Sequence, residues 1–277
     1  MKLTVLVDNN TIIDRYFLGE PGVSYLINTD GKTILFDTGY SDIFIKNAQR
    51  MNIDLLSVDT LVFSHGHNDH TWGVAEFIRL RSEAQSEGKS GEKPDLIAHP
   101  RTFDKKIIDG NSIGSFFPKD SFSSYFHLRL TEQPLWITNK LVFLGEIHRN
   151  NDFEAQRPIG KCIDKTEQDD YLLDDSALAY KAKDGLIIVT GCSHAGICNI
   201  IEQAKKVCQE DRILDIIGGF HLLNPSERQL ERTIDYFKTL HPDKVHAAHC
   251  TDFASKVKLS EVVKIEEVGV GLTLQYE

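Results

Sequence analysis

The chain has 277 residues and a formal net charge of -10, and 41% of its residues are hydrophobic and 26% are charged. This composition predicts a folded protein with a substantial core, and its acidic balance argues against a nucleic-acid partner, which would need a basic face. No apolar run is long enough to cross a membrane. The five cysteines lack disulfide spacing and the N-terminus lacks signal-peptide character, so a reducing cytoplasm is the expected location.

The first part of the chain predicts strands that alternate with helices. Strands are expected at residues 3–7, 23–27, 33–36, 60–63 and 96–100, with a hairpin turn at residues 28–31. A helix is expected over residues 41–51, and a second one, capped by Thr71, extends to about residue 84. Residues 85–94 are rich in Ser, Gly, Glu and Lys and predict a solvated loop. His99 ends a strand and is expected to be structural, with a role in the site as the alternative.

A loop rich in metal-binding side chains follows the strand at residues 60–63. It reads Ser64-His65-Gly66-His67-Asn68-Asp69-His70, with three histidines and an aspartate within six residues. Imidazoles and a carboxylate suit zinc, iron, manganese or nickel. His65 and His67 can point at one ion, while Asp69 and His70 could hold a second. Gly66 is expected to let the backbone turn sharply. The alternative is a polar loop that happens to be rich in histidine.

Two segments in the middle of the chain predict insertions. Residues 101–135 have weak periodicity and several aromatic side chains, which either pack the insertion onto the body or form a wall for an aromatic substrate. A strand at residues 141–144 follows. Residues 150–171 are polar and irregular and could form a lid.

The second half predicts strands whose ends carry histidines. Strands are expected at residues 174–180, 186–190, 213–217 and 245–248, and helices at 197–208 and from the cap Asn224, with Pro225 first, to about residue 240. His194, His221 and His249 each follow a strand. Ligand sites in α/β folds gather at the carboxyl ends of strands, so these histidines predict one site shared with the loop. The other histidines, His127, His241 and His246, lack this context and are expected on the surface or in packing.

The loop motif, His65-x-His67-x-Asp69-His70 after a strand and preceded by Asp37-Thr38-Gly39, resembles the metallo-β-lactamase superfamily. The resemblance implies an α/β fold in the form of a four-layer αββα sandwich, with the site along the edge between two sheets. It also implies a single domain over residues 1–277, with the insertions near 101–135 and 150–171.

Further motifs resemble one branch of this superfamily, the dihydropterin synthase-like branch. They are Gly145-Glu146-Ile147, Asp174-Asp175-x-Ala177-Leu178, Gly191-Cys192-Ser193-His194-Ala195-Gly196, Gly218-Gly219-Phe220-His221-Leu222 and His249-Cys250-Thr251. The namesake activity joins a dihydropterin to a ribofuranosyl-aminobenzene phosphate. The chain departs from the branch at Leu144, His148, Ser176 and Asp252, where the branch often has threonine, proline, glutamine and glycine. His148 and Arg149 lie where a substrate could be recognised, so the substrate can differ.

The resemblance implies one or two divalent metal ions, zinc first, with manganese and iron as alternatives. His65 and His67 would bind the first ion, and Asp69 and His70 the second. His194 would supply a further ligand, and His249 corresponds to the superfamily's terminal ligand. His221 is either a ligand or a proton donor.

Four more residues are implied around the metal ligands. Asp37 is expected to support the ligands from behind, and Glu146 and Arg149 either support them or contact the substrate. Cys192 stands where much of the superfamily has a bridging aspartate. Its thiolate could bridge two ions, or it could be a buried, inert thiol.

The expected function is that of a metal-dependent hydrolase or dihydropterin synthase-like transferase. The substrate is expected to be a phosphorylated, pterin-like small molecule. A bound metal lowers the pKa of water from about 16 to near 7; Asp69 would orient that water and His221 could protonate the leaving group. The alternatives are a phosphodiesterase or other metallohydrolase, and a non-catalytic metal-binding sensor. The oligomeric state stays open.

Overall fold

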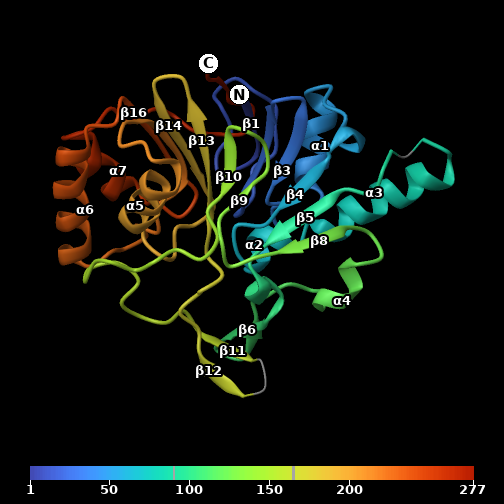
Figure 1. Ribbon diagram of the computed structural model, residues 1–277, viewed down its shortest axis with the longest axis horizontal. Coiled ribbons are helices and arrows are strands. Elements are labelled where there is room, and N and C mark those ends of the chain that lie inside the picture. Colours follow the sequence, from blue (N-terminus) through green and yellow to red (C-terminus); the bar gives the residue numbers. More distant parts are fainter. Residues whose placement is uncertain (90, 164–165) are drawn as a thin grey trace.

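The computed structural model describes residues 1–89, 91–163 and 166–277, which form a sandwich of two large sheets with helices on both outer faces (Figure 1). One sheet has the strand order β17-β1-β2-β3-β4-β5-β8, and the other has the order β16-β15-β14-β13-β10-β9. The predicted four-layer αββα sandwich is therefore confirmed.

The first sheet is apolar on both faces because it lies between the second sheet and a layer of helices. Leu3 and Val5 of β1 face the second sheet, whereas Leu6 faces the helices. Its strands are β1 (Lys2–Val7), β2 (Ser24–Thr29), β3 (Lys32–Phe36), β4 (Thr60–Val62), β5 (Asp95–Ala98), β8 (His127–Leu130) and β17 (Thr273–Gln275). The helical elements on this side are α1 (Ile43–Arg50), η1 (Leu55–Ser57), α2 (Asn68–Thr71), α3 (Val74–Ser86), η2 (Pro100–Phe103) and α4 (Lys119–Phe122).

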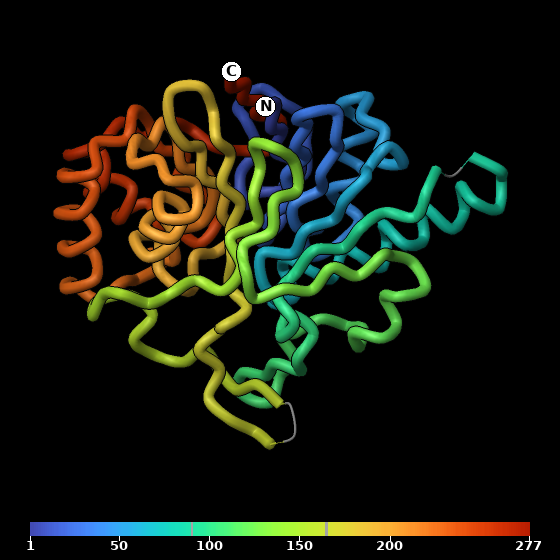
Figure 2. Tube along the Cα trace, in the orientation of Figure 1, coloured from blue at the N-terminus to red at the C-terminus, as the bar shows by residue number. Residues whose placement is uncertain are grey.

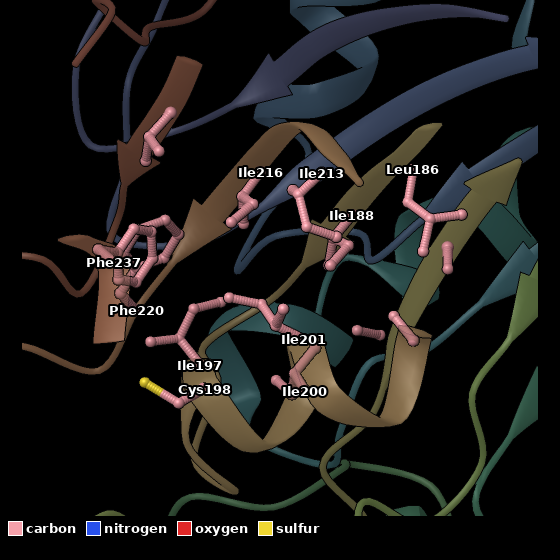
Figure 3. Close-up of a cluster of buried hydrophobic side chains, with 14 of the residues drawn as sticks. Leu186, Ile188, Ile197, Cys198, Ile200, Ile201, Ile213, Ile216, Phe220 and Phe237 are labelled. Atoms are coloured by element: carbon pink, nitrogen blue, oxygen red, sulfur yellow. The ribbon is translucent and has the colours of Figure 1, made fainter. Parts of the chain in front are cut away.

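The second sheet packs its outer face against α5, α6 and α7. Figure 3 shows Ile197, Ile200 and Ile201 of α5 lying against Ile188 and Ile216 of the sheet. Their spacing places one apolar stripe of the helix on the sheet. The strands are β9 (Leu135–Trp136), β10 (Leu141–Phe143), β13 (Ala177–Ala182), β14 (Gly185–Thr190), β15 (Ile213–Gly219) and β16 (Lys244–Ala248), and the helices are α5 (Ile197–Cys208), α6 (Glu227–Leu240) and α7 (Phe253–Ser260).

The two predicted insertions meet in a small third sheet at one end of the molecule (Figure 2). Its strands are β6 (Lys105–Ile108), β7 (Asn111–Ser112), β11 (Lys161–Ile163) and β12 (Glu167–Asp169). Antiparallel pairing of β6 with β11 joins segments that are more than 50 residues apart in sequence. The segment 150–171 was predicted to be irregular, but it contains the strands β11 and β12. Residues 164 and 165 of this segment lie outside the described ranges. Residue 90 of the predicted loop at 85–94 also lies outside them.

Two predicted helix starts are wrong. The helix after the metal loop is broken into α2 and α3, and Gly73 precedes α3. Thr71 is not a cap, because it is the last residue of α2 and its hydroxyl donates to the His67 carbonyl at 2.9 Å. Helix α6 begins at Glu227, where the Ser226 hydroxyl accepts a hydrogen bond from the Gln229 backbone. The longest described helix has 14 residues, and no helix in the described ranges is long and apolar enough to cross a membrane.

The Glu154 side chain anchors the segment that was predicted to be a lid. Its carboxylate, 1% exposed, accepts hydrogen bonds from the Cys198 and Asn199 backbones at the start of α5, at 2.9 and 3.1 Å. We expect Glu154→Ala to lower the free energy of unfolding by about 2 kcal/mol, because it leaves these buried donors unsatisfied. Urea unfolding measures the change. Asp152→Ala, at an exposed ion pair with Arg228, is the matched control and should cost less than about 1 kcal/mol; equal effects would contradict the anchoring role.

Candidate metal centre

The predicted metal-binding residues come together at one edge of the sandwich. Strand β4 runs parallel to β3, and β14, β15 and β16 run parallel to one another, so the segments after their carboxyl ends meet. The segment after β14 packs directly on the metal loop. A Cβ at Gly191 would lie 2.2 Å from the Ser64 hydroxyl, so only glycine fits there.

One group of ligand atoms contains His65, Cys192 and His194. These atoms all lie within 4.8 Å of one another, and the two imidazole Nε2 atoms are 3.2 Å apart. The His67 ring lies 4.7 Å from the His65 ring and 4.8 Å from the His194 ring, measured between centroids. Its Nε2 atom is buried and has no hydrogen-bond partner among the described residues. The three imidazoles therefore enclose one small space.

A second group contains Asp69, His70, Cys192 and His249, again with all ligand atoms within 4.8 Å. The Cys192 sulfur lies 3.2 Å from His70 Nε2 and 3.1 Å from His249 Nε2. The Asp69 carboxylate lies 3.3 Å from His249 Nε2 and 3.6 Å from His70 Nε2. Cys192 belongs to both groups, so one sulfur lies between them.

These donors fit divalent metal ions. Two nitrogens on one tetrahedral zinc are about 3.3 Å apart, close to the separation between His65 and His194. Burial lowers the pKa of His65 and of His194, and it lowers the pKa of His67 to about 4. The three imidazoles are therefore neutral at pH 7 and have free lone pairs. Without a cation, the buried Nε2 of His67 would stay unsatisfied.

Asp37 lies behind both groups. It is fully buried, and its carboxylate lies 2.7 Å from His70 Nδ1. The Ser64 hydroxyl donates to the same carboxylate at 2.7 Å and lies 3.0 Å from His65 Nδ1. Burial alone would lower the pKa of His70, but Asp69 and Asp37 outweigh it and raise that pKa to about 9. A carboxylate in this position orients the imidazole with Nε2 toward the centre.

A buried ion-pair triad, which the sequence analysis missed, holds the metal loop from the other side. Lys106 Nζ lies 2.8 Å from Asp170 and 2.9 Å from Asp174, and Asp174 also accepts the Gly66 backbone N–H at 2.7 Å. In the sequence Asp174 stands out only as part of a motif, because its partner Lys106 lies in an insertion. Gly66 is required for close packing rather than for a sharp turn, since a Cβ there would lie 2.2 Å from the Thr102 carbonyl oxygen.

The comparisons with known proteins agree with this geometry. Residues 18–96 match the model of the metallo-beta-lactamase superfamily. The chain is 32% identical to an uncharacterized protein of Methanocaldococcus jannaschii over 94% of both chains. The chain belongs to the metallo-β-lactamase superfamily. It is also 27% identical to a protein of the same organism named 7,8-dihydropterin-6-methyl-4-(beta-D-ribofuranosyl)-aminobenzene-5'-phosphate synthase, over 95% of this chain and 92% of that protein.

Two solved structures share the architecture over nearly the whole chain. The crystal structure of Tm1679, described as a metal-dependent hydrolase of the beta-lactamase superfamily, superposes with a TM-score of 0.83 at 27% identity, over 99% of this chain and 98% of that one. A diphosphatase of the PhnP family superposes with a TM-score of 0.56 at 16% identity, over 100% and 98% of the two chains, and shows the fold alone. The metallo-β-lactamase fold implies divalent metal binding, and the two ligand groups are its candidate site.

His221 lies at the border of the candidate site rather than in either ligand group. Its ring is 4.4 Å from the His194 ring, and its Nδ1 atom is buried without a partner among the described residues. Both rings line a pocket of about 480 Å³ together with Arg157 and Arg228. Asp175, behind His194, accepts the Ala195 backbone N–H at 2.8 Å, and burial raises its pKa to about 7.

The structure does not bring Glu146 and Arg149 to the ligand cluster. Glu146 lies 3.3 Å from the buried His99, whose other ring nitrogen accepts the Arg101 backbone N–H. Arg149 donates to the carbonyls of Tyr171 and Leu172 and so holds the end of the segment 150–171. Both contacts join these side chains to segments that their motif does not reveal, and a role for either side chain in contacting the substrate stays a prediction.

The other histidines lie where the sequence analysis expected them. His246 is buried 2.8 Å from the Asp215 carboxylate, which is a packing contact. His241 ends α6 in a left-handed conformation, and His127 is exposed at the start of β8.

Several residues at the strand ends around the candidate metal centre have left-handed backbone conformations. Asp37, Ser193, His221 and His249 have φ angles of 57°, 61°, 51° and 48°. Such conformations are unfavourable for residues with a Cβ and persist where the surrounding structure imposes them, often at functional sites. Of these residues, His249 supplies a ligand atom to the second group, and Asp37 lies 2.7 Å from His70 Nδ1 behind that group.

Proposed function

We propose that this protein is a metal-dependent hydrolase that acts on the phosphate ester of a small molecule. The single observation behind this proposal is the pair of ligand groups that share the Cys192 sulfur. Two adjacent cation sites suit a substrate that carries a phosphate, because each ion can offset charge on a phosphoryl oxygen.

In this proposal His65, His67 and His194 hold one ion, and Asp69, His70 and His249 hold the other. Cys192 belongs to both groups and would supply its sulfur as a thiolate ligand. Burial raises the pKa of the free thiol, but a metal ion deprotonates a thiol that coordinates it. Support for this assignment is that the ligand atoms of the six side chains other than His67 fall into two compact groups, and that the His67 ring centroid lies within 4.8 Å of those of His65 and His194.

The ions, when bound, make water a nucleophile near neutral pH and offset the negative charge of the phosphate. The chain itself supplies the proton handling. The Asp69 carboxylate accepts a proton and orients the reactants, and it is partly open to solvent. The buried Nδ1 atom of His221 has no partner among the described residues, and His221 lines the pocket beside His194, where it would donate a proton to a leaving group. Asp37 and Ser64 fix the orientation of His70 and His65.

A second candidate function is condensation rather than hydrolysis. The relative named as a dihydropterin-ribofuranosyl-aminobenzene-phosphate synthase matches nearly the whole chain, which favours a reaction of that kind. In a condensation, the same residues would hold the ions, which would offset the charge of a phosphate leaving group. The two functions are separated by assaying bis(4-nitrophenyl) phosphate against pterin substrates with the same preparation.

We expect metal removal to abolish turnover. Elemental mass spectrometry of protein purified without chelator should find two equivalents of zinc, manganese or iron per chain. Dialysis against a chelator should reduce hydrolysis of bis(4-nitrophenyl) phosphate by about 10³-fold or more, and adding back the same ion should restore it. Full activity of metal-free protein would contradict the proposal. Metal and ligand binding without any turnover would identify a non-catalytic sensor instead.

A further inference from the structure

An apolar pocket opens beside the metal loop, on the side of His67 and Asp69. Its volume is about 460 Å³, and it is lined by these two residues and by Pro21, Tyr40, Ile108 and Ile113. Pockets of this size, mostly apolar with a few polar groups, are typical of small-molecule sites. A ligand in it would lie directly against two of the residues proposed to hold metal.

One wall of this pocket is formed by Tyr40, whose ring packs on another aromatic ring. Tyr40 lies 4.8 Å from Trp72 between ring centroids, and Trp72 stacks on Phe116 at 3.8 Å with an interplanar angle of 20°. The Trp72 indole donates to the Gly114 carbonyl at 2.8 Å, and the Tyr40 backbone N–H donates to Glu20 at 2.9 Å. The Trp72 ring therefore supports the Tyr40 ring, and support of this kind lowers the entropic cost of binding.

The opposite wall comes from the insertion. Ile108 ends β6 and Ile113 follows β7, and the Asn68 backbone N–H donates to the Ile113 carbonyl at 2.8 Å. This bond ties the insertion to the metal loop. Tyr40 and Ile108 remain 44% and 39% exposed, although both are large and apolar. Exposed apolar surface that adjoins a polar site is characteristic of ligand binding.

We propose that this pocket, the ring pocket, binds a planar aromatic ring of the substrate, which is joined to the phosphate that reacts at the metal centre. The phosphate part of the inference rests on the proposed function. The ring part rests on the Tyr40 wall, since a flat ring can stack on it in an offset arrangement while the isoleucines cover its other face. An aliphatic group would fill the space without this stacking.

The test uses metal-loaded protein and three phosphonates that cannot be hydrolysed. Phenylphosphonate, cyclohexylphosphonate and methylphosphonate present the same anion and differ in the attached group. We expect calorimetry to show that phenylphosphonate binds about fivefold tighter than cyclohexylphosphonate and at least about tenfold tighter than methylphosphonate. Tyr40→Ala should remove the preference for phenyl. Tyr125→Ala, which removes an equally exposed tyrosine (45%) beside α3, should keep it.

Several results would overturn the ring pocket. Equal affinity for the three phosphonates, or tighter binding of the cyclohexyl compound, would exclude a site for a flat ring. A dimer in sedimentation that Tyr40→Ala dissociates would assign the surface to a second copy of the chain. If Tyr40→Ala fails to fold, Ile108→Ser on the opposite wall takes its place.

A separate probe distinguishes failure of the ring pocket from failure of the proposed function. If no phosphonate binds, the phosphate part is contradicted, and pterin, which has no phosphate, tests the ring part alone. The chain has two tryptophans, so Trp136→Phe leaves Trp72 as the reporter. Pterin should quench its fluorescence, and Tyr40→Ala should weaken that binding about fivefold. Absence of quenching would overturn the inference.

Discussion

Replacing Asp69 with asparagine should reduce kcat for bis(4-nitrophenyl) phosphate by about 10³-fold or more. The amide has nearly the same shape but carries no charge, so it binds a cation weakly and cannot accept a proton at neutral pH. The neighbouring His70 and His249 hold the pKa of Asp69 below its usual value despite burial, which favours the charged form that the variant removes. Steady-state kinetics with matched metal loading measures the loss.

The control for this substitution is Asp95→Asn. The Asp95 side chain is 32% exposed, compared with 26% for Asp69, and it forms an ion pair with Arg129. Asp95 lies at the start of β5, away from the carboxyl ends of the strands where the ligand groups lie. It should leave kcat unchanged. The metal-free Asp69→Asn protein should keep its free energy of unfolding within about 1 kcal/mol of the parent chain. Unchanged turnover in this variant would remove Asp69 from the proposed mechanism.

Replacing Lys106 with methionine should produce the largest loss of stability among the substitutions considered. Lys106 is 1% exposed, and removing its charge leaves the carboxylates of Asp170 and Asp174 buried without their cation. Breaking a buried ion pair in this way costs about 3–5 kcal/mol. Because Asp174 also holds the Gly66 backbone, we expect metal affinity to fall by about 10- to 100-fold.

Urea unfolding of the metal-free protein and competition with a zinc chelator measure these two effects. Lys105→Met changes the neighbouring, exposed lysine on the other face of β6, and it should alter stability by less than about 0.5 kcal/mol. If Lys106→Met does not fold, Asp170→Asn weakens the same triad more gently. Normal metal affinity in a destabilised variant would show that the triad supports the fold without positioning the loop.

The aromatic residues of the first insertion show what the sequence could predict and what it could not. Two interpretations were open for these rings, packing onto the body or a wall for a substrate, and the structure shows how several of them pack. Phe122 and Phe126 are buried in the core beneath the helices, with Phe103 packed against them. Phe116 instead stacks on Trp72 beside the metal loop. Periodicity could not separate these roles, because the segment contains mostly short elements and turns.

The sequence by itself determined the sandwich and most residues of the ligand groups. Its strands are short, continuous apolar runs, and a histidine follows several of them, so the local pattern carries the information. Only the tertiary structure decided that His221 lies beside the groups, that Glu146 and Arg149 contact other segments, and that Lys106 supports the loop. The physical reason is that each of these contacts joins segments far apart in the chain, and such pairs leave no spacing in the sequence.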